Sequence, residues 1–156
     1  MVWRRFNGET IVEPIRELVE RTILEETKKG FRLKVCIGTD SRVKGRLIEF
    51  ASVIVFLREH RGGFMFISNT RVEGKMSVKE RMIQEVARSV DVAYNLCELL
   101  DKYKVELEIH ADINSDPDFA SNSALRDAMG YVLGMGFVFK AKPDAFASTC
   151  CADKMV

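Results

Sequence analysis

The sequence predicts an α/β fold in which a mixed five-stranded sheet is flanked by helices and preceded by an N-terminal helix. The hydrophobic pattern alternates between the two-residue period of strands and the 3.6-residue period of helices. Short glycine-containing connectors join the first three strand-like stretches, which is typical of antiparallel hairpins. Helix-length segments precede the last two strand-like stretches, which favours placing these two strands parallel to the first strand. With 156 residues and no repeat or linker, the chain is expected to form one domain, residues 1–156.

The first 30 residues are predicted to form a helical extension. In VEPIRELVERTILEETKKG (12–30), Pro14 stands near the start of a helical pattern and Gly30 marks its end. The predicted buried stripe consists of Ile15, Leu18, Val19, Thr22 and Ile23.

Three antiparallel strands are predicted next. RLKVCIGTDS (32–41) alternates apolar and polar residues, and IEFASVIVFL (48–57) and FMFISNT (64–70) are apolar runs. The connectors RVKGR (42–46) and REHRGG (58–63) are short enough for hairpins.

A long crossover helix is predicted to follow. In residues 76–100 the apolar period becomes helical, and Ser77 and Glu80 have the spacing of a capping box. The remaining segments are predicted as a strand at VELEIHA (105–111), a helix at SNSALRDAMGYVL (121–133), a strand at FVFKA (137–141) and a last helix opening with Pro143.

Composition excludes some classes of protein. The chain has 24 basic and 23 acidic residues, so it lacks the strong positive charge of many nucleic-acid-binding proteins. No stretch approaches the roughly 18 apolar residues of a membrane span, and the N-terminus lacks a signal-peptide core. The four cysteines, at 36, 97, 150 and 151, show no metal-binding spacing and are expected to be free thiols. A cytoplasmic protein that does not contact a membrane is expected.

Two aspartates are predicted to meet at the ends of neighbouring strands. The crossover helix favours a right-handed connection that lays strand 105–111 parallel to strand 32–41. Asp40 and Asp112 would then lie just past the C-terminal ends of adjacent central strands, where open α/β sheets bind ligands. Because two such carboxylates repel each other unless they share a cation, a divalent metal is expected. Hard oxygen ligands without a His or Cys cluster indicate Mg²⁺ or Mn²⁺.

Four motifs cover most of the chain: IGTDS (37–41), ERMIQEVARS (80–89), HADIN (110–114) and KPDAFASTCCADK (142–154). In these motifs and their order the sequence resembles the YkuK family of the ribonuclease H-like superfamily. The resemblance implies a ribonuclease H-like fold and a set of acids that converge on divalent metal, namely Asp40, Glu85, Asp112 and either Asp144 or Asp153. It also implies a nuclease that hydrolyses phosphodiester bonds at a two-metal carboxylate site, with RNA, DNA or a hybrid of the two as partner.

Most acids in these motifs also have a structural explanation. An aspartate at a strand end can be explained by turn chemistry alone. Asp40 and Asp112 are nevertheless assigned to the site, because the predicted sheet places them where such folds bind ligands. Glu85 lies off the apolar stripe, where glutamates are usually solvated, and it is assigned on the resemblance. Capping accounts for Glu80. Turn or helix-entry chemistry accounts for both acids of SDPD (115–118), which are not expected to be primary ligands.

The C-terminal acid has two candidates. Asp144 follows Pro143 in the first turn of the predicted helix, where the helix dipole also favours an acid. Asp153 lies three residues before the end of the sequence, where a helix tends to fray. Because the two lie nine residues apart on opposite helix faces, only one is expected to reach the site, and Asp144 is preferred. The accessory candidates are Ser41, His110, Asn114 and Lys142.

A second class of function shares this fold. A ribonuclease H-like domain without catalysis would use the same cleft, or its first helix, to bind nucleic acid or another protein. Weak affinity for divalent metal despite intact folding would identify such a domain. The metal-dependent nuclease is the preferred interpretation.

Overall fold

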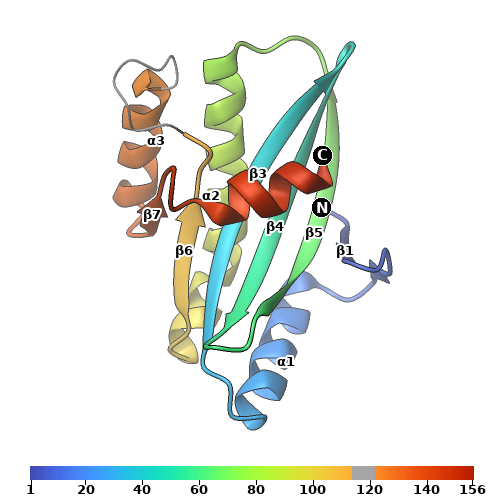
Figure 1. The fold of residues 1–156 in the computed structure, drawn as a ribbon, viewed down its shortest axis with the longest axis vertical. Coiled ribbons are helices and arrows are strands. Elements are labelled where there is room, and N and C mark those ends of the chain that lie inside the picture. Colours follow the sequence, from blue (N-terminus) through green and yellow to red (C-terminus); the bar gives the residue numbers. More distant parts are fainter. Residues whose placement is uncertain (114–121) are drawn as a thin grey trace.

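The described residues form one mixed sheet with helices on both faces (Figure 1). The structure is a computed structural model that describes residues 1–113 and 122–156, with side chains from residue 126 onward in the second range. Seven strands pair in the order β2-β1-β5-β4-β3-β6-β7. This mixed, helix-flanked sheet confirms the predicted fold class, although it has two strands more than the predicted five.

Strands β3 (Leu33–Lys44), β4 (Leu47–Arg58) and β5 (Gly63–Glu73) form the antiparallel part of the sheet, as predicted. Their hairpin turns contain Gly45 (φ 65°) and Gly62 (φ 68°). Both residues adopt the left-handed region, which glycine reaches without the steric cost that a Cβ atom would impose.

Helix α2 (Val78–Lys102) connects the hairpins to the parallel part of the sheet. Ser77 Oγ accepts a hydrogen bond from the Glu80 N–H (3.1 Å), and Glu80 Oε2 accepts one from the Ser77 N–H (2.6 Å). These two bonds form the predicted capping box and fix where the helix begins. None of the described helices is long and apolar enough to cross a membrane.

The crossover lays β6 (Glu106–His110) parallel to β3, with His110 opposite Gly38. Helix α3 (Asn122–Gly134) then leads to β7 (Val138–Lys140), which is parallel to β6. The parallel arrangement of these strands agrees with the prediction.

The N-terminal segment is not helical throughout, so the prediction of a helical extension over residues 1–30 is partly wrong. Strands β1 (Trp3–Arg5) and β2 (Thr10–Ile11) form a small hairpin that pairs with β5. Trp3 is buried in the main core and holds this hairpin against the sheet. Strands this short show no two-residue period that a sequence pattern could reveal. Helix α1 (Ile15–Lys28) follows as predicted.

The last helix begins later than predicted. Pro143 and Asp144 lie in a turn, in which the Asp144 N–H donates to the Ala141 carbonyl (2.9 Å). Helical hydrogen bonding starts at the Ala145 carbonyl, which accepts from the Thr149 N–H (3.0 Å). The reason is topological, since the chain must first pass from strand β7 to the face of the sheet over β3. We call η1 (Ala147–Ala152, π-helical) and η2 (Asp153–Met155, 3₁₀) together the C-terminal helix.

Each face of the sheet has its own apolar core. On one face, α1 and α2 pack on the main core. On the other face, the C-terminal helix crosses in front of β3 and β4 (Figure 1) and covers a smaller core that includes Cys36, Val53, Val55 and Ile67. Strand β3 therefore lies between helical layers on both sides.

The backbone of the C-terminal helix touches β3 at Gly38. A Cβ atom at Gly38 would lie 2.5 Å from Ser148 N and 2.6 Å from the Ala147 carbonyl carbon, which is closer than real Cβ atoms approach backbone. Gly38 therefore sets the distance between this helix and the part of β3 that carries Asp40.

Replacing Gly38 by alanine is expected to push the C-terminal helix away from β3. We expect Gly38→Ala to lower the free energy of unfolding by about 1–3 kcal/mol, because the added methyl group overpacks a backbone contact. Urea denaturation measures the change. Gly130→Ala in α3 is the matched control, since nothing lies within 4 Å of the added Cβ. Alanine there is expected to leave stability unchanged or to raise it by about 0.5–1 kcal/mol. Equal effects at the two glycines would contradict the proposed contact.

Candidate active site

Asp40 lies inside β3, with four residues of the strand still to follow, and not past the strand end as predicted. The antiparallel hairpin with β4 extends the strand as far as Lys44. Burial and the neighbouring Asp153 carboxylate together raise the pKa of Asp40 to about 6, although the Ser41 N–H and Arg81 act in the opposite direction. Asp40 therefore has a second acid at its side in a partly buried position.

Glu85 on α2 is buried, with 6% of its surface exposed, so the interpretation of Glu85 as a solvated helix residue is wrong. Ser41 Oγ donates a hydrogen bond to Glu85 Oε1 (2.5 Å). The buried face of α2 includes polar residues as well as its apolar stripe. One turn beyond Glu85, Ser89 Oγ hydrogen-bonds to Thr39 Oγ1 (2.9 Å). Burial raises the pKa of Glu85 to about 7, and the charge of Asp40 adds to this increase.

Arg81 lies one turn before Glu85 on α2. Its Nη1 donates to Ser41 Oγ at 2.9 Å, so the Ser41 hydroxyl accepts from Arg81 and donates to Glu85. Arg81 also lowers the pKa values of Asp40 and Glu85, although burial outweighs it at both. No sequence pattern identifies Arg81, because its contact with β3 depends on tertiary packing.

Asp153 reaches the side of Asp40 from the C-terminal helix. Its carboxylate lies 3.7 Å from Arg42 Nη2 and is about half exposed, at 53%. The segment is not frayed, because Asn69 Nδ2 donates to the Met155 carbonyl (2.8 Å) and ties the helix to β5. Asp144, the preferred candidate from the sequence, is exposed in the turn before the helix. Of the two C-terminal acids, Asp153 is the one beside Asp40.

Asp112 lies two residues beyond the end of β6. The last parallel pair is Gly38 with His110, so Asp112 and Asp40 each follow that pair by two residues. Lys142 Nζ is 2.5 Å from Asp112 Oδ1, which is a buried atom. The two groups form an ion pair. Lys142, an accessory candidate, thus neutralises part of the charge on Asp112.

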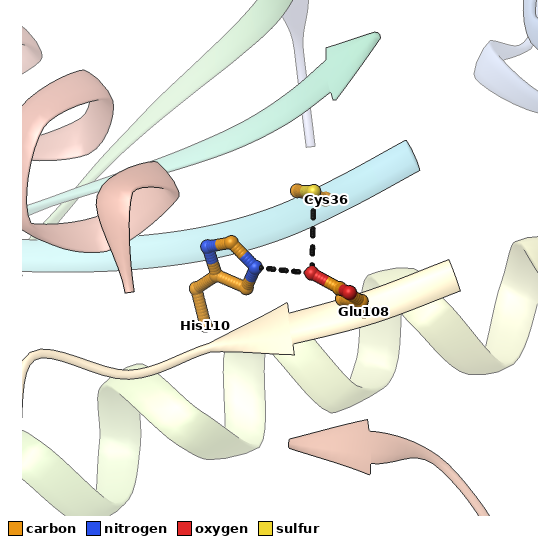
Figure 2. A group of neighbouring side chains, drawn as sticks. All are labelled: Cys36, Glu108 and His110. Carbon is orange, nitrogen blue, oxygen red and sulfur yellow. Dashed lines mark hydrogen bonds and ion pairs between the residues drawn. The ribbon is translucent and has the colours of Figure 1, made fainter. Parts of the chain in front are cut away.

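His110 lies in a buried group with Cys36 and Glu108 (Figure 2). Their ligand atoms lie within 4.8 Å of one another. His110 Nε2 and Glu108 Oε2 are 2.9 Å apart, and the Cys36 thiol donates weakly to the same oxygen at 3.8 Å.

This buried group does not fit a metal ion. The Ala147 N–H donates to His110 Nδ1 (3.1 Å), so a neutral ring must carry its proton on Nε2, the atom that would have to bind the metal. Burial also raises the pKa of the Cys36 thiol to about 12, which disfavours the thiolate. Lys34 Nζ already pairs with Glu108 Oε1 (2.9 Å).

Three polar residues considered in the sequence lie outside the described residues: Asn114, Asp116 and Asp118.

The raised pKa of Glu85 predicts that stability falls as pH rises through the range from its ordinary value of 4.5 to about 7. In this range the folded state binds more protons than the unfolded state, so the free energy of unfolding decreases with pH. His110 acts in the opposite direction below 6.5, because burial lowers its pKa. Glu85→Gln removes the titration and keeps the acceptor for Ser41.

Without divalent ions, we expect wild type to lose on the order of 2 kcal/mol more than Glu85→Gln between pH 4.5 and pH 7.5. Urea denaturation in chelator at several pH values measures the difference. Parallel pH profiles for the two proteins would contradict the prediction.

Comparison with known proteins agrees with the fold. A family model described as Ribonuclease H-like matches residues 14–156, and it supports the resemblance to the YkuK family. No curated protein and no solved structure matches the chain. The matched range includes every strand from β3 to β7 and all the acids described above. The chain therefore belongs to the ribonuclease H-like family.

Proposed function

We propose that the protein is a divalent-metal-dependent nuclease that hydrolyses phosphodiester bonds of nucleic acid at the acids around Asp40. One observation carries the proposal. Asp153 lies beside Asp40, and Glu85 lies near enough to feel the charge of Asp40, with the pKa of Asp40 raised to about 6 and that of Glu85 to about 7. Such a group of partly buried acids is typical of functional sites. Family membership supports the proposal, because the resemblance implies that acids at these positions converge on metal.

The residues present fit a hard divalent cation. A shared cation would relieve the repulsion that contributes to the raised pKa values of Asp40 and Glu85. Lys142 Nζ lies 2.5 Å from Asp112 Oδ1, so this ammonium would have to move aside for a cation to bind that oxygen. All the candidate ligand atoms are carboxylate oxygens, which Mg²⁺ and Mn²⁺ prefer.

Each acid has a distinct proposed role. Asp40 has both Glu85 and Asp153 as neighbours, so we assign it as the ligand shared by two ions. Glu85 and Asp112 would complete one position and Asp153 the other. Bound ions would lower the pKa of an attacking water and would neutralise charge on the leaving oxygen.

The chain positions Glu85 without help from a metal. Ser41 holds one oxygen of the Glu85 carboxylate, and Arg81 holds Ser41. This arrangement keeps a buried acid beside Asp40 and limits the movement needed when a cation binds. A cation would also favour the ionised forms of both acids, because it stabilises the charge that burial penalises.

Neutralising Asp40 is expected to abolish tight metal binding without unfolding the protein. In Mn²⁺ calorimetry, we expect Asp40→Asn and Asp153→Asn each to lose at least about 10-fold in affinity. Asp144→Asn is the matched control and should bind as wild type does. Both site variants should be at least as stable as wild type, since each removes a repelling charge.

Cleavage assays on labelled RNA–DNA hybrid, single-stranded RNA and single-stranded DNA complete the test. Metal-dependent cleavage by wild type and Asp144→Asn, with loss in Asp40→Asn, would support the nuclease. If folded wild type binds no Mn²⁺ at millimolar concentration, the nuclease proposal fails. The alternative, a non-catalytic ribonuclease H-like domain that binds nucleic acid or protein, would then be preferred.

A further inference from the structure

A chain of polar contacts links Lys34, near the start of β3, to the first residue of the C-terminal helix through Glu108 and His110, and Figure 2 shows these last two residues. Lys34 Nζ pairs with Glu108 Oε1 at 2.9 Å, and Glu108 Oε2 lies 2.9 Å from His110 Nε2. His110 Nδ1 in turn accepts the Ala147 N–H at 3.1 Å. We call Lys34, Glu108 and His110 the relay.

The hydrogen bonds of the relay fix the orientation of the His110 ring. Because Ala147 donates to Nδ1, the neutral ring carries its proton on Nε2 and donates it to Glu108. Burial raises the pKa of Glu108, but hydrogen bonds from His110 and Lys34 outweigh this effect and hold the pKa below its ordinary value. Glu108 therefore remains an ionised acceptor. In the His110 ring, Nδ1 acts as an acceptor and Nε2 as a donor.

The relay acts on the helix segment that carries Asp153. Ala147 is the first residue of that helix, and its fully buried neighbour Ser148 contacts Gly38. The Phe146 ring packs edge-on against His110, with 4.8 Å between ring centroids. The far end of the helix is tied to β5 by the bond from Asn69 to the Met155 carbonyl. The helix is thus held at both ends, with Asp153 near the second.

We propose that Lys34, Glu108 and His110 are positioning residues that orient the C-terminal helix so that Asp153 reaches Asp40. The inference rests on the proposed function, since Asp153 matters for catalysis only if these acids bind metal. None of the three relay residues is a ligand in this proposal. They act through the Ala147 N–H, in the way that outer hydrogen bonds orient ligands elsewhere.

Two substitutions of His110 separate its two hydrogen bonds. The side-chain oxygen of asparagine occupies the position of Nδ1, so His110→Asn keeps an acceptor for Ala147 and loses the bond to Glu108. The amide of glutamine lies near the position of Nε2, so His110→Gln keeps a partner for Glu108 and loses the acceptor for Ala147. Both variants lose the ring that packs on Phe146, so they are matched in lost packing.

The first measurement is amide hydrogen exchange across residues 146–153 in metal-free protein. We expect His110→Asn to retain protection close to that of wild type and His110→Gln to exchange at least about 10-fold faster. Glu108→Gln, which removes the closer of the two carboxylates paired with Lys34, should lie between them. Urea denaturation of the same variants separates local opening from global loss of stability. Equal exchange in His110→Asn and His110→Gln would overturn the proposal.

The second measurement is Mn²⁺ calorimetry on the same proteins. We expect His110→Gln to bind Mn²⁺ about 10-fold more weakly than wild type and His110→Asn to differ by less than about 3-fold. Affinity lost equally in both variants, in parallel with their stability, would mean a merely structural role and would overturn the proposal. If wild type binds no Mn²⁺, the proposed function fails, and hydrogen exchange alone decides whether the relay orients the helix.

Discussion

The close backbone contact at Gly38 is the constraint on which the grouping of acids depends. Consecutive residues of a strand face opposite sides of the sheet, so Asp40 faces the C-terminal helix while Ser41 faces α2. Asp40 therefore meets Asp153 on one side, and Ser41 meets Glu85 on the other. A larger residue than glycine at position 38 would separate the C-terminal helix from β3 and remove one of these contacts. One strand thus gathers acids from two helical layers.

This arrangement is costly for a protein without bound cations. Burial and a neighbouring acid, Asp153 at Asp40 and Asp40 at Glu85, raise the pKa values of these two residues, which means that their ionised forms are disfavoured in the fold. Ser41 and Arg81 offset part of this cost at Glu85. The remainder must be offset by packing elsewhere, such as the two apolar cores on either side of β3. Functional sites commonly contain such locally unfavourable arrangements, whose cost is offset elsewhere in the fold.

Local signals in the sequence predicted most of the fold but only part of the site. The Ser77–Glu80 capping box and the glycine connectors act within a few residues, so they could be read directly. The β1–β2 hairpin was missed because its stability comes from burying Trp3, a tertiary effect. The burial of Glu85 depends on Ser41, 44 residues away in the sequence. Asp144 was preferred to Asp153 because the tie from Asn69 to Met155, over 86 residues, leaves no local pattern.

The two buried polar groups on this sheet differ in charge balance, and that difference decides which of them a cation would stabilise. Glu108 has Lys34 and His110 as partners, and its pKa lies below the ordinary value. A metal there would have to displace a proton from His110 Nε2 and compete with a lysine already in place. Asp40 and Glu85 have pKa values above the ordinary range, because burial raises both and because a neighbouring acid, Asp153 for Asp40 and Asp40 for Glu85, raises each pKa as well. A cation added among them would reduce repulsion and replace a proton that is weakly held near neutral pH. The Glu108 carboxylate is thus already compensated by neighbouring positive groups, whereas the acids around Asp40 are those that the proposed cation would stabilise.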